Sequence, residues 1–459
     1  MTTSLQPDRG QPATLLHLVD KAGLDAFLGG LPEPVRALLR AGRFAGKPGE
    51  VAAFPDNGGQ AIAVGVAAPG TLGLYDLSAA AERLPAGAYR LASGQPGSAA
   101  LGWLLAGYRF DRYRKEPEDL GARVLLTADP AAIAPAEAEA QATFLVRDLV
   151  NTPAEDLGPA ELEAEAARIA GAHGATLAVT RGDRLQAEFP LIHAVGRAAA
   201  RGREPRLVEL EWGNPAHPRV AVVGKGVTFD TGGLDIKPAP GMRLMKKDMG
   251  GAAHALALAQ LIVASRLPVR LHLLLPLAEN AVSGPALRPG DVVRARDGTH
   301  VEIHNTDAEG RLILADALVR AGEAAPALIL DFATLTGAAR VALGPDLPAM
   351  FSDDEELAAE WETAGRATED PVWRLPLWAP YDEMLKSDIA DVANAHDGGM
   401  AGTITAALFL KRFVPAGLPW AHLDTFAWRP TPKPGRPKGG EALGLRSASA
   451  LLRARFGQG

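Results

Sequence analysis

Short apolar runs alternate with longer helical patterns along most of the chain. The runs with strand character are 177–180, 207–212, 220–223, 269–275 and 327–331. Between them lie helical stretches, including one that starts at Pro159 and an alanine-rich one that starts near Gly250. Strands that alternate with helices build a mostly parallel sheet with helices on both faces. We therefore expect an α/β fold with a mostly parallel central sheet for this part of the chain.

The first 130 residues show a smaller version of this pattern. Strands are predicted at 61–66 and 124–128, and helices at 78–84 and 100–110. A helix at 135–149, with Pro135 in its first turn, connects this part to the rest. The predicted domains are a small N-terminal α/β domain at 1–130, a linking helix at 131–158 and a larger C-terminal domain at 159–459.

Composition narrows the class of protein. The 459 residues are 47% hydrophobic and 22% charged, which is typical of a soluble globular protein. The net charge of −7 gives no general attraction to nucleic acid or anionic membranes. Because cysteine is absent, oxygen and nitrogen must supply the ligands of any metal. No apolar run approaches the roughly 18 residues of a membrane helix, and no signal-peptide pattern is present, so we expect a cytoplasmic protein.

Two acids stand directly before an apolar run. Asp307 and Glu309 precede residues 312–319, which have the apolar density of a buried helix. In an extended segment, or at a strand-to-helix turn, both carboxylates can converge on one point. Converging carboxylates repel each other unless a cation neutralises them, and divalent metals do this. Acids also favour the positive end of a helix dipole, so both explanations stay open on these residues alone.

A second stretch, 219–250, places single charges on a glycine-rich path. Lys225 stands between Gly224 and Gly226 after an apolar strand, and Asp230, Lys237 and Asp248 follow it. Loops at the carboxyl ends of strands carry the active sites of open α/β sheets. A surface loop with ordinary salt bridges is the alternative.

Together these stretches resemble the signatures of the leucyl (cytosol) aminopeptidase family, whose members are dinuclear metal peptidases. The resemblance rests on residues 224–233 (GKGVTFDTGG), 236–238 (IKP), 247–253 (KDMGGAA) and 305–312 (NTDAEGRL). It runs from about Arg147 to the last helix, while the N-terminal part resembles the family only weakly. That domain usually regulates or assembles the enzyme in the family.

The resemblance implies two divalent metal ions per subunit, Zn²⁺ or Mn²⁺, with Mg²⁺ also compatible with the ligands. Lys225, Asp230, Asp248 and Glu309 would hold one ion. Asp230, Asp307 and Glu309 would hold the other, with the backbone carbonyl of Asp307. A lysine amine binds metal only when neutral, and burial and adjacent cations both lower a lysine pKa.

The implied activity is removal of the first residue of a peptide by a metal-activated hydroxide, with the substrate's free α-amine on one metal. Lys237 would stabilise the oxyanion, and Arg311 would hold a bicarbonate ion that serves as proton shuttle. Without the resemblance, a salt bridge to a neighbouring acid would be the preferred role for Arg311.

Four residues resemble the family's pocket for the first side chain: Met245, Thr334, Leu335 and Gly337. This pocket favours an apolar residue such as leucine, although Met and Leu can equally belong to a core. Residues 425–428 (TFAW) depart from the small, glycine-containing stretch of the family. The departure bears on the substrate range and on the homohexamer that the resemblance implies.

Two histidines beside the motifs are left out of the ligand set. His254 enters the alanine-rich helix and is expected to pack there, and His304 alternates with Val301 and Ile303 in a predicted strand. Two other functions stay open: a narrow dipeptidase of Cys-Gly type, and a binding or DNA-associated protein that keeps the fold. The expected partners are peptide substrates and further copies of the chain, without membrane or nucleic acid.

Overall fold

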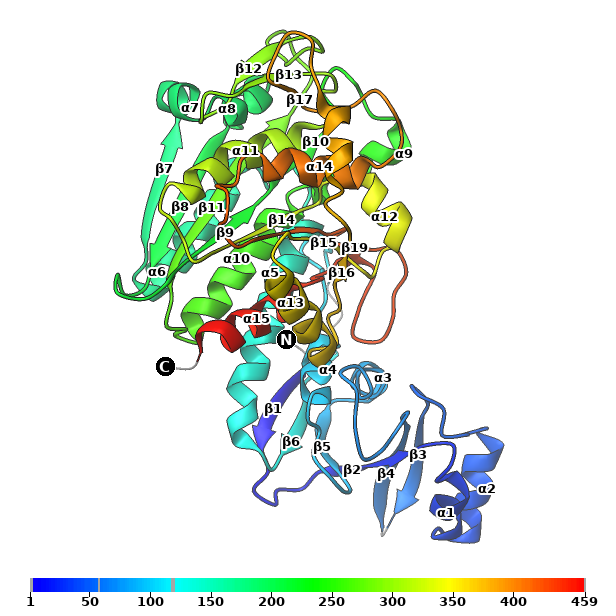
Figure 1. Cartoon of the computed structure of the whole chain (residues 1–459). Helices are drawn as coiled ribbons and strands as arrows, with labels where there is room; N and C mark the ends of the chain where they lie inside the picture. Colours follow the sequence, from blue (N-terminus) through cyan, green and yellow to red (C-terminus); the bar gives the residue numbers. More distant parts are fainter. Residues whose placement is uncertain (1–2, 57, 117–119, 458–459) are drawn as a thin grey trace. The chain divides into compact units, whose positions relative to one another are not determined.

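The computed structural model describes residues 3–56, 58–116 and 120–457, which separate into two compact units (Figure 1). The smaller unit extends up to Phe144 and includes Pro430–Lys438, and the larger comprises Leu145–Arg429 and the chain from Gly439. Helix α5 (Ile133–Asn151) crosses this division. A smaller N-terminal and a larger C-terminal α/β part are thus confirmed. The boundaries at 130 and 158 stay predictions.

The smaller unit is built on a six-stranded sheet in the order β1-β6-β5-β2-β4-β3, in which only the β3–β4 pair is antiparallel. Its strands are β1 (Thr3–Pro7), β2 (Thr14–Val19), β3 (Val51–Asp56), β4 (Gly59–Gly65), β5 (Gly87–Leu91) and β6 (Arg123–Thr127). Its helices are α1 (Leu24–Gly29), α2 (Glu33–Ala41), α3 (Ser78–Arg83) and α4 (Ala99–Leu105). The strands expected at 61–66 and 124–128 and the helix at 78–84 are confirmed within two residues at each end.

The helix expected at 100–110 is wrong in its second half, because α4 ends at Leu105. The backbone of Gly107 approaches β1 so closely that a β-carbon there would lie 3.0 Å from the backbone nitrogen of Thr3. The chain leaves the helix in two tight turns, with Gly107 N donating to Leu104 O and Tyr108 N to Leu105 O.

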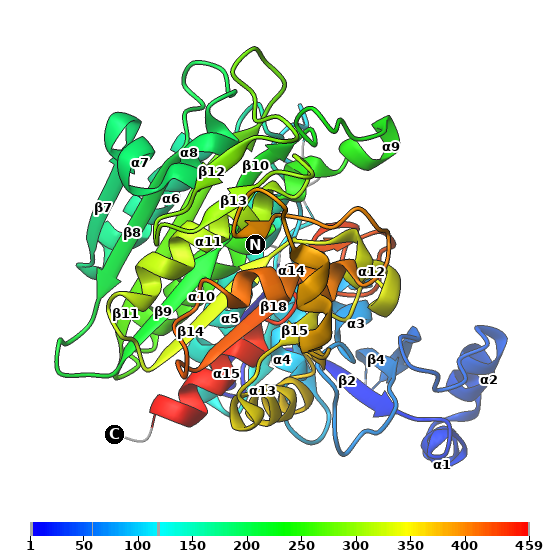
Figure 2. The same cartoon turned by 45° about the horizontal axis from the view of Figure 1, so that its top comes forward.

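The larger unit contains a nine-stranded sheet in the order β16-β15-β18-β14-β9-β11-β8-β7, with β10 paired to β11 (Figure 2). Its strands are β7 (Thr176–Arg181), β8 (Arg206–Trp212), β9 (Arg219–Gly224), β10 (Gly226–Asp230), β11 (Arg270–Asn280), β14 (Leu328–Ala333), β15 (Ala349–Phe351), β16 (Trp373–Arg374) and β18 (Trp420–Asp424). The central strands β18, β14, β9 and β11 are parallel, and antiparallel pairs occur only towards the edges. The mostly parallel sheet is confirmed.

Helices cover both faces of this sheet. The helices of the larger unit are α6 (Pro159–His173), α7 (Gly182–Glu188), α8 (Pro190–Gly196), α9 (Ala239–Met242), α10 (Gly250–Ala264), α11 (Glu309–Gly322), α12 (Gly337–Leu343), α13 (Glu355–Ala367), α14 (Gly402–Lys411) and α15 (Leu445–Phe456). Ala221 and Val223 of β9 pack in one core cluster with α11, so the alternate side chains Val220 and Val222 point to the other face. Within the described residues, none of the helices combines the length and apolarity needed to cross a membrane.

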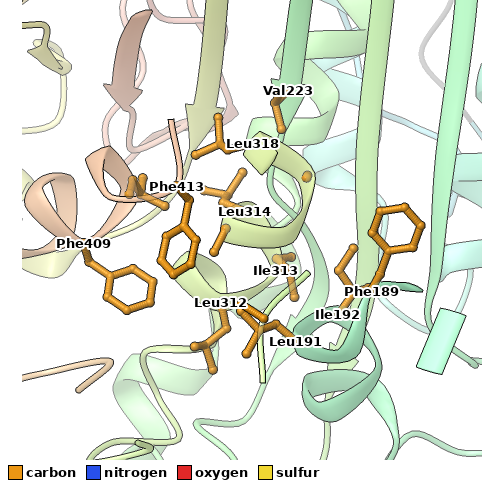
Figure 3. Packing of buried hydrophobic residues seen from close by; sticks show 14 of the residues in the cluster. Phe189, Leu191, Ile192, Val223, Leu312, Ile313, Leu314, Leu318, Phe409 and Phe413 are labelled. Carbon is orange, nitrogen blue, oxygen red and sulfur yellow. The ribbon is translucent and has the colours of Figure 1, made fainter. Parts of the chain in front are cut away.

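Helix α11 forms the centre of a large core cluster (Figure 3). Its side chains Leu312, Ile313, Leu314 and Leu318 are fully buried and share this cluster with the 189–192 segment and with Phe409. The buried helix expected at 312–319 is confirmed. Because α11 begins at Glu309, the core that fixes this helix also fixes the position of Glu309, one of the predicted metal ligands.

Candidate metal centre

The parallel strands of the larger unit end at one edge, and a polar side chain follows or closes each of four strands. Lys225 follows β9, Asp230 closes β10, Thr334 follows β14 and Asp424 closes β18. All four side chains line one cavity of about 460 Å³. The carboxyl edge of a parallel sheet is where α/β folds place their sites, as the sequence predicted.

Three carboxylates converge in this cavity. Asp230, Asp307 and Glu309 each offer one oxygen, and these oxygens lie within 4.8 Å of one another. Glu309 is the first residue of α11 and Asp307 lies in the turn before it, so the two acids meet at the start of a helix. Asp248, the fourth predicted acid, enters from the turn after Met245–Lys247 and is also buried.

Lys225 lies at the centre of the acids. Its Nζ lies 2.7 Å from Asp248 Oδ2 and 2.9 Å from Glu309 Oε1, and it is almost fully buried. Burial disfavours the charged amine, but the carboxylates of Asp248, Glu309 and Asp230 outweigh it and raise the pKa of Lys225 above its usual range. With these acids unneutralised, Lys225 is therefore a cation.

Lys237 joins the two acids on the other side of the cavity. Its Nζ lies 2.7 Å from Asp230 Oδ2 and also contacts Asp307 Oδ1. Burial alone would lower the pKa of Lys237, but the acids Asp230, Glu309 and Asp307 raise it above its usual range. Both predicted lysines therefore belong to the same cluster as the predicted ligands.

The carboxylates fit a divalent cation. Glu309 Oε1 and Asp307 Oδ1 have only the amines of Lys225 and Lys237 as near partners, and Glu309 Oε2 accepts no hydrogen bond from the described residues. Burial, followed by repulsion from Asp230, raises the pKa of Glu309 to about 8 and that of Asp307 to about 6. Buried acid oxygens that have so few donors, in a cluster this dense, are what a hard cation would satisfy.

Arg311 reaches the cavity from the second residue after Glu309. Its Nη1 donates to the backbone oxygen of Asn394 at 2.7 Å, while its buried Nε has no hydrogen-bond partner among the described residues. Burial lowers the pKa of Arg311 to about 10. The salt bridge to a neighbouring acid, considered above as the alternative, is not found among these residues. The free Nε fits an oxygen of an anion in the cavity.

Asn394 was missed by sequence reasoning. Its Oδ1 accepts from the backbone nitrogens of His304 and Asn305, and its Nδ2 donates to Asn305 O at 2.7 Å. It follows β17 (Val392–Ala393), which pairs with β13 (His300–Glu302) and thereby brings Asn394 beside the acid-bearing turn. No local signal marks it, because its partners lie about 90 residues earlier in the chain.

Two further polar side chains orient the ligands. Asn280, at the end of β11, donates from Nδ2 to Asp230 Oδ1 at 2.9 Å, and Thr334 donates from Oγ1 to Asp248 Oδ1 at 2.8 Å. Such hydrogen bonds fix the direction of metal-binding carboxylates. Thr334 was expected only as a pocket residue.

The residues expected to contact the first side chain line the same cavity. Met245, Thr334, Leu335 and Gly337 all face it. Asp424 holds the loop that contains Leu335 by accepting hydrogen bonds from the backbone nitrogens of Leu335 and Thr336. These positions therefore lie with the acids in one site.

His254 packs as expected, whereas His304 does not lie in the predicted strand. His254 Nδ1 lies 2.7 Å from Gly250 O, and its Nε2 accepts a hydrogen bond from Leu443 N. The ring is therefore held between α10 and the backbone at Leu443. The strand that contains Val301 ends at Glu302, so His304 lies beyond it, and its Nε2 lies 3.1 Å from a Glu302 oxygen. Neither belongs to the cluster of converging acids.

Comparison with known proteins identifies relatives along almost the whole chain. The model of the cytosol aminopeptidase family, catalytic domain, matches residues 144–448, and that of the M17 aminopeptidase, N-terminal domain, matches residues 14–127. The weakly similar N-terminal part thus has a family match of its own. A probable cytosol aminopeptidase of Leifsonia xyli is 40% identical, over 95% of this chain and 93% of that protein.

Solved structures show the same similarity. The crystal structure of the cytosol aminopeptidase from Coxiella burnetii has a TM-score of 0.93 and 42% identity, and the match covers 98% of this chain and 99% of that one. The bottromycin maturation enzyme BotP in complex with Mn has a TM-score of 0.86 and 37% identity, over 97% of this chain and 100% of that one.

Proposed function

The chain belongs to the cytosol aminopeptidase family and is an aminopeptidase, and on that premise we propose that it removes apolar, leucine-like first residues from peptides at a dinuclear metal site. The observation that carries the proposal is the convergence of four acids and two lysines in one cavity.

In this proposal Lys225, Asp230, Asp248 and Glu309 hold one divalent ion. Asp230, Asp307 and Glu309 hold the second, with the backbone carbonyl of Asp307, and the ions are Zn²⁺ or Mn²⁺, with Mg²⁺ compatible. When bound, such ions polarise a carbonyl and make water a nucleophile at neutral pH. To act as a ligand Lys225 would have to lose its proton to solvent, and adjacent cations would favour the neutral amine.

The other predicted side chains would contact the substrate or a bicarbonate ion. Lys237 places its ammonium beside Asp230 and Asp307, where it would stabilise the negative charge that forms on the attacked carbonyl oxygen. Arg311 would hold bicarbonate through its free Nε, and bound bicarbonate supplies a site for proton transfer. Met245, Leu335 and Gly337 would contact the first side chain.

The test compares leucine p-nitroanilide with its N-acetylated form, using metal-stripped protein reloaded with Mn²⁺ or Zn²⁺. We expect metal-dependent release from the free amine and none from the acetylated compound, because an aminopeptidase must bind the α-amine. Equal cleavage of both would contradict the proposal. A Cys-Gly dipeptide tested beside them separates a narrow dipeptidase from the broader enzyme.

We also propose a cytoplasmic homohexamer in which the N-terminal domain assembles or regulates the enzyme. The support is the family relationship together with exposed apolar side chains such as Trp378, Ile389 and Met400. Light scattering after size exclusion tests the assembly, and a mass of one chain, about 48 kDa, would contradict it.

A further inference from the structure

The segment that follows β18 lines the cavity with two side chains that the proposed mechanism does not use. Thr425 and Phe426 both face the cavity, in the stretch that departs from the family sequence. Thr425 is 1% exposed, and its Oγ1 has no hydrogen-bond partner among the described residues. Phe426 is only half-buried, so its ring borders the open space.

The ring of Phe426 lies between the two walls of the proposed first-residue pocket. The guanidinium carbon of Arg340 lies 4.8 Å from the ring centroid, and Lys247 Nζ lies 5.6 Å from it. Lys247 ends the short turn that starts at Met245, and Arg340 lies in α12, which starts at Gly337. Phe426 thus spans the gap between the two segments that would contact the first side chain.

This ring is held in place from both sides. The backbone nitrogen of Thr425 donates to Ala333 O at 2.8 Å, and Glu441 N donates to Ala427 O at 3.1 Å. Ala427 is fully buried with a φ of +52°, a left-handed conformation that is uncommon for alanine. The two cations over the ring add attraction of their own. The backbone that carries Phe426 is therefore fixed on both sides of the residue.

We propose that Phe426 limits the depth of the first-residue pocket, so that the enzyme favours aliphatic first residues such as leucine over phenylalanine, tyrosine and tryptophan. The inference rests on the proposed function. The Phe426 ring takes up space at the wall of this pocket that an aromatic first residue would need, and the backbone that carries the ring is fixed on both sides. A single methylene in a hydrophobic pocket already changes specificity by about 10- to 200-fold.

The experiment measures kcat/KM for phenylalanine and leucine p-nitroanilides with metal-loaded wild-type protein, Phe426→Ala and Phe426→Leu. We expect Phe426→Ala to raise the phenylalanine-to-leucine ratio at least about tenfold, and Phe426→Leu to raise it less. If Phe426→Ala does not fold, the smaller rise in the phenylalanine-to-leucine ratio of Phe426→Leu tests the inference. Trp373→Ala, at an exposed aromatic outside the cavity, serves as control and leaves the ratio unchanged.

An unchanged or lowered ratio in both Phe426 variants overturns the inference, because a ring that attracts aromatic substrates by stacking would give a lower ratio. Such a result, with normal leucine anilide cleavage by the wild type, leaves the proposed function intact. If the metal-loaded wild type cleaves neither compound, the proposed function has failed and this inference falls with it.

Discussion

Gly310 leaves the space that the Lys225 side chain occupies. A β-carbon at Gly310 would lie 2.6 Å from Lys225 Nζ, which is closer than real side chains approach. Gly310 is the second residue of α11, directly after Glu309, so the helix start and the buried amine are packed against each other. A glycine at this position therefore allows an acid and a lysine to reach the same point.

Gly310→Ala should displace Lys225 from Asp248 and Glu309. We expect metal affinity to fall about 10- to 100-fold, as when residues that orient metal ligands are lost, with activity falling in parallel. Calorimetric titration of metal-stripped protein with Mn²⁺ measures the affinity. Gly171→Ala, in α6 with nothing within 4 Å of its β-carbon, is the matched control and should leave metal binding unchanged. Equal affinities in all three proteins would refute the coupling.

Lys237→Met should lower kcat while both ions still bind. Loss of one group that stabilises a developing oxyanion costs about 10²- to 10³-fold in kcat. Lys386→Met, at an exposed lysine paired with Glu383 outside the cavity, is the control. Steady-state kinetics with leucine anilide, together with metal analysis of the variant, check the prediction. A variant that loses its metal instead would assign Lys237 to metal binding.

Glu441 holds two buried arginines in the larger unit. Its carboxylate accepts from Arg147 Nη2 at 3.0 Å and from Arg429 Nε at 3.1 Å, and all three side chains are at most 3% exposed. Glu441→Ala leaves both guanidinium groups without this acid, and should lower the free energy of unfolding by about 3–5 kcal/mol. Urea unfolding of the variant and the wild type measures this difference in the free energy of unfolding. The matched change at the exposed Glu355, which pairs with Arg374, should have little effect.

The buried pair of His422 and Asp331 predicts a pH dependence of stability. Burial lowers the pKa of His422, and so does repulsion from Arg311. Attraction to Asp331, whose Oδ1 lies 2.5 Å from His422 Nδ1, and then to Asp424 outweighs both, so the pKa of His422 is raised. A raised pKa in the folded state gives stability that is complete below the unfolded value of about 6.5 and is lost as pH rises through the folded value.

The measurement is urea unfolding of the wild type and Asp331→Asn from pH 6 to pH 9. The difference in unfolding free energy between the two should shrink as pH rises above about 6.5, because the neutral histidine gains little from the carboxylate. A difference that does not change with pH would show that the pair is not a charged one.

The sequence predicted which charged residues lie together better than it predicted the ends of the elements. Asp230, Asp248, Asp307 and Glu309 could be found because isolated charges beside glycines and apolar strands are locally visible. Parallel strands then had to bring them to one edge. Helix α11 was predictable because eight successive residues are dense in apolar side chains.

The remaining features depend on tertiary contacts. Asn394 is an asparagine between two alanines in the sequence, and only the pairing of β17 with β13 gives it a role. The early end of α4 depends on the approach of Gly107 to Thr3, which lies about 100 residues away. The charge state of Lys225 depends on which acids surround it, and spacing along the chain does not give that.

The central claim is that these acids hold two metal ions on which peptide cleavage depends. The most direct measurement determines the number of Mn²⁺ or Zn²⁺ ions bound per chain and the rate of leucine anilide cleavage, for the wild type and Asp307→Ala. We predict two ions and metal-dependent cleavage for the wild type, and for Asp307→Ala one ion and almost no cleavage. A folded wild-type protein that binds two ions and cleaves no peptide or anilide, or an Asp307→Ala variant with full activity, would contradict the account.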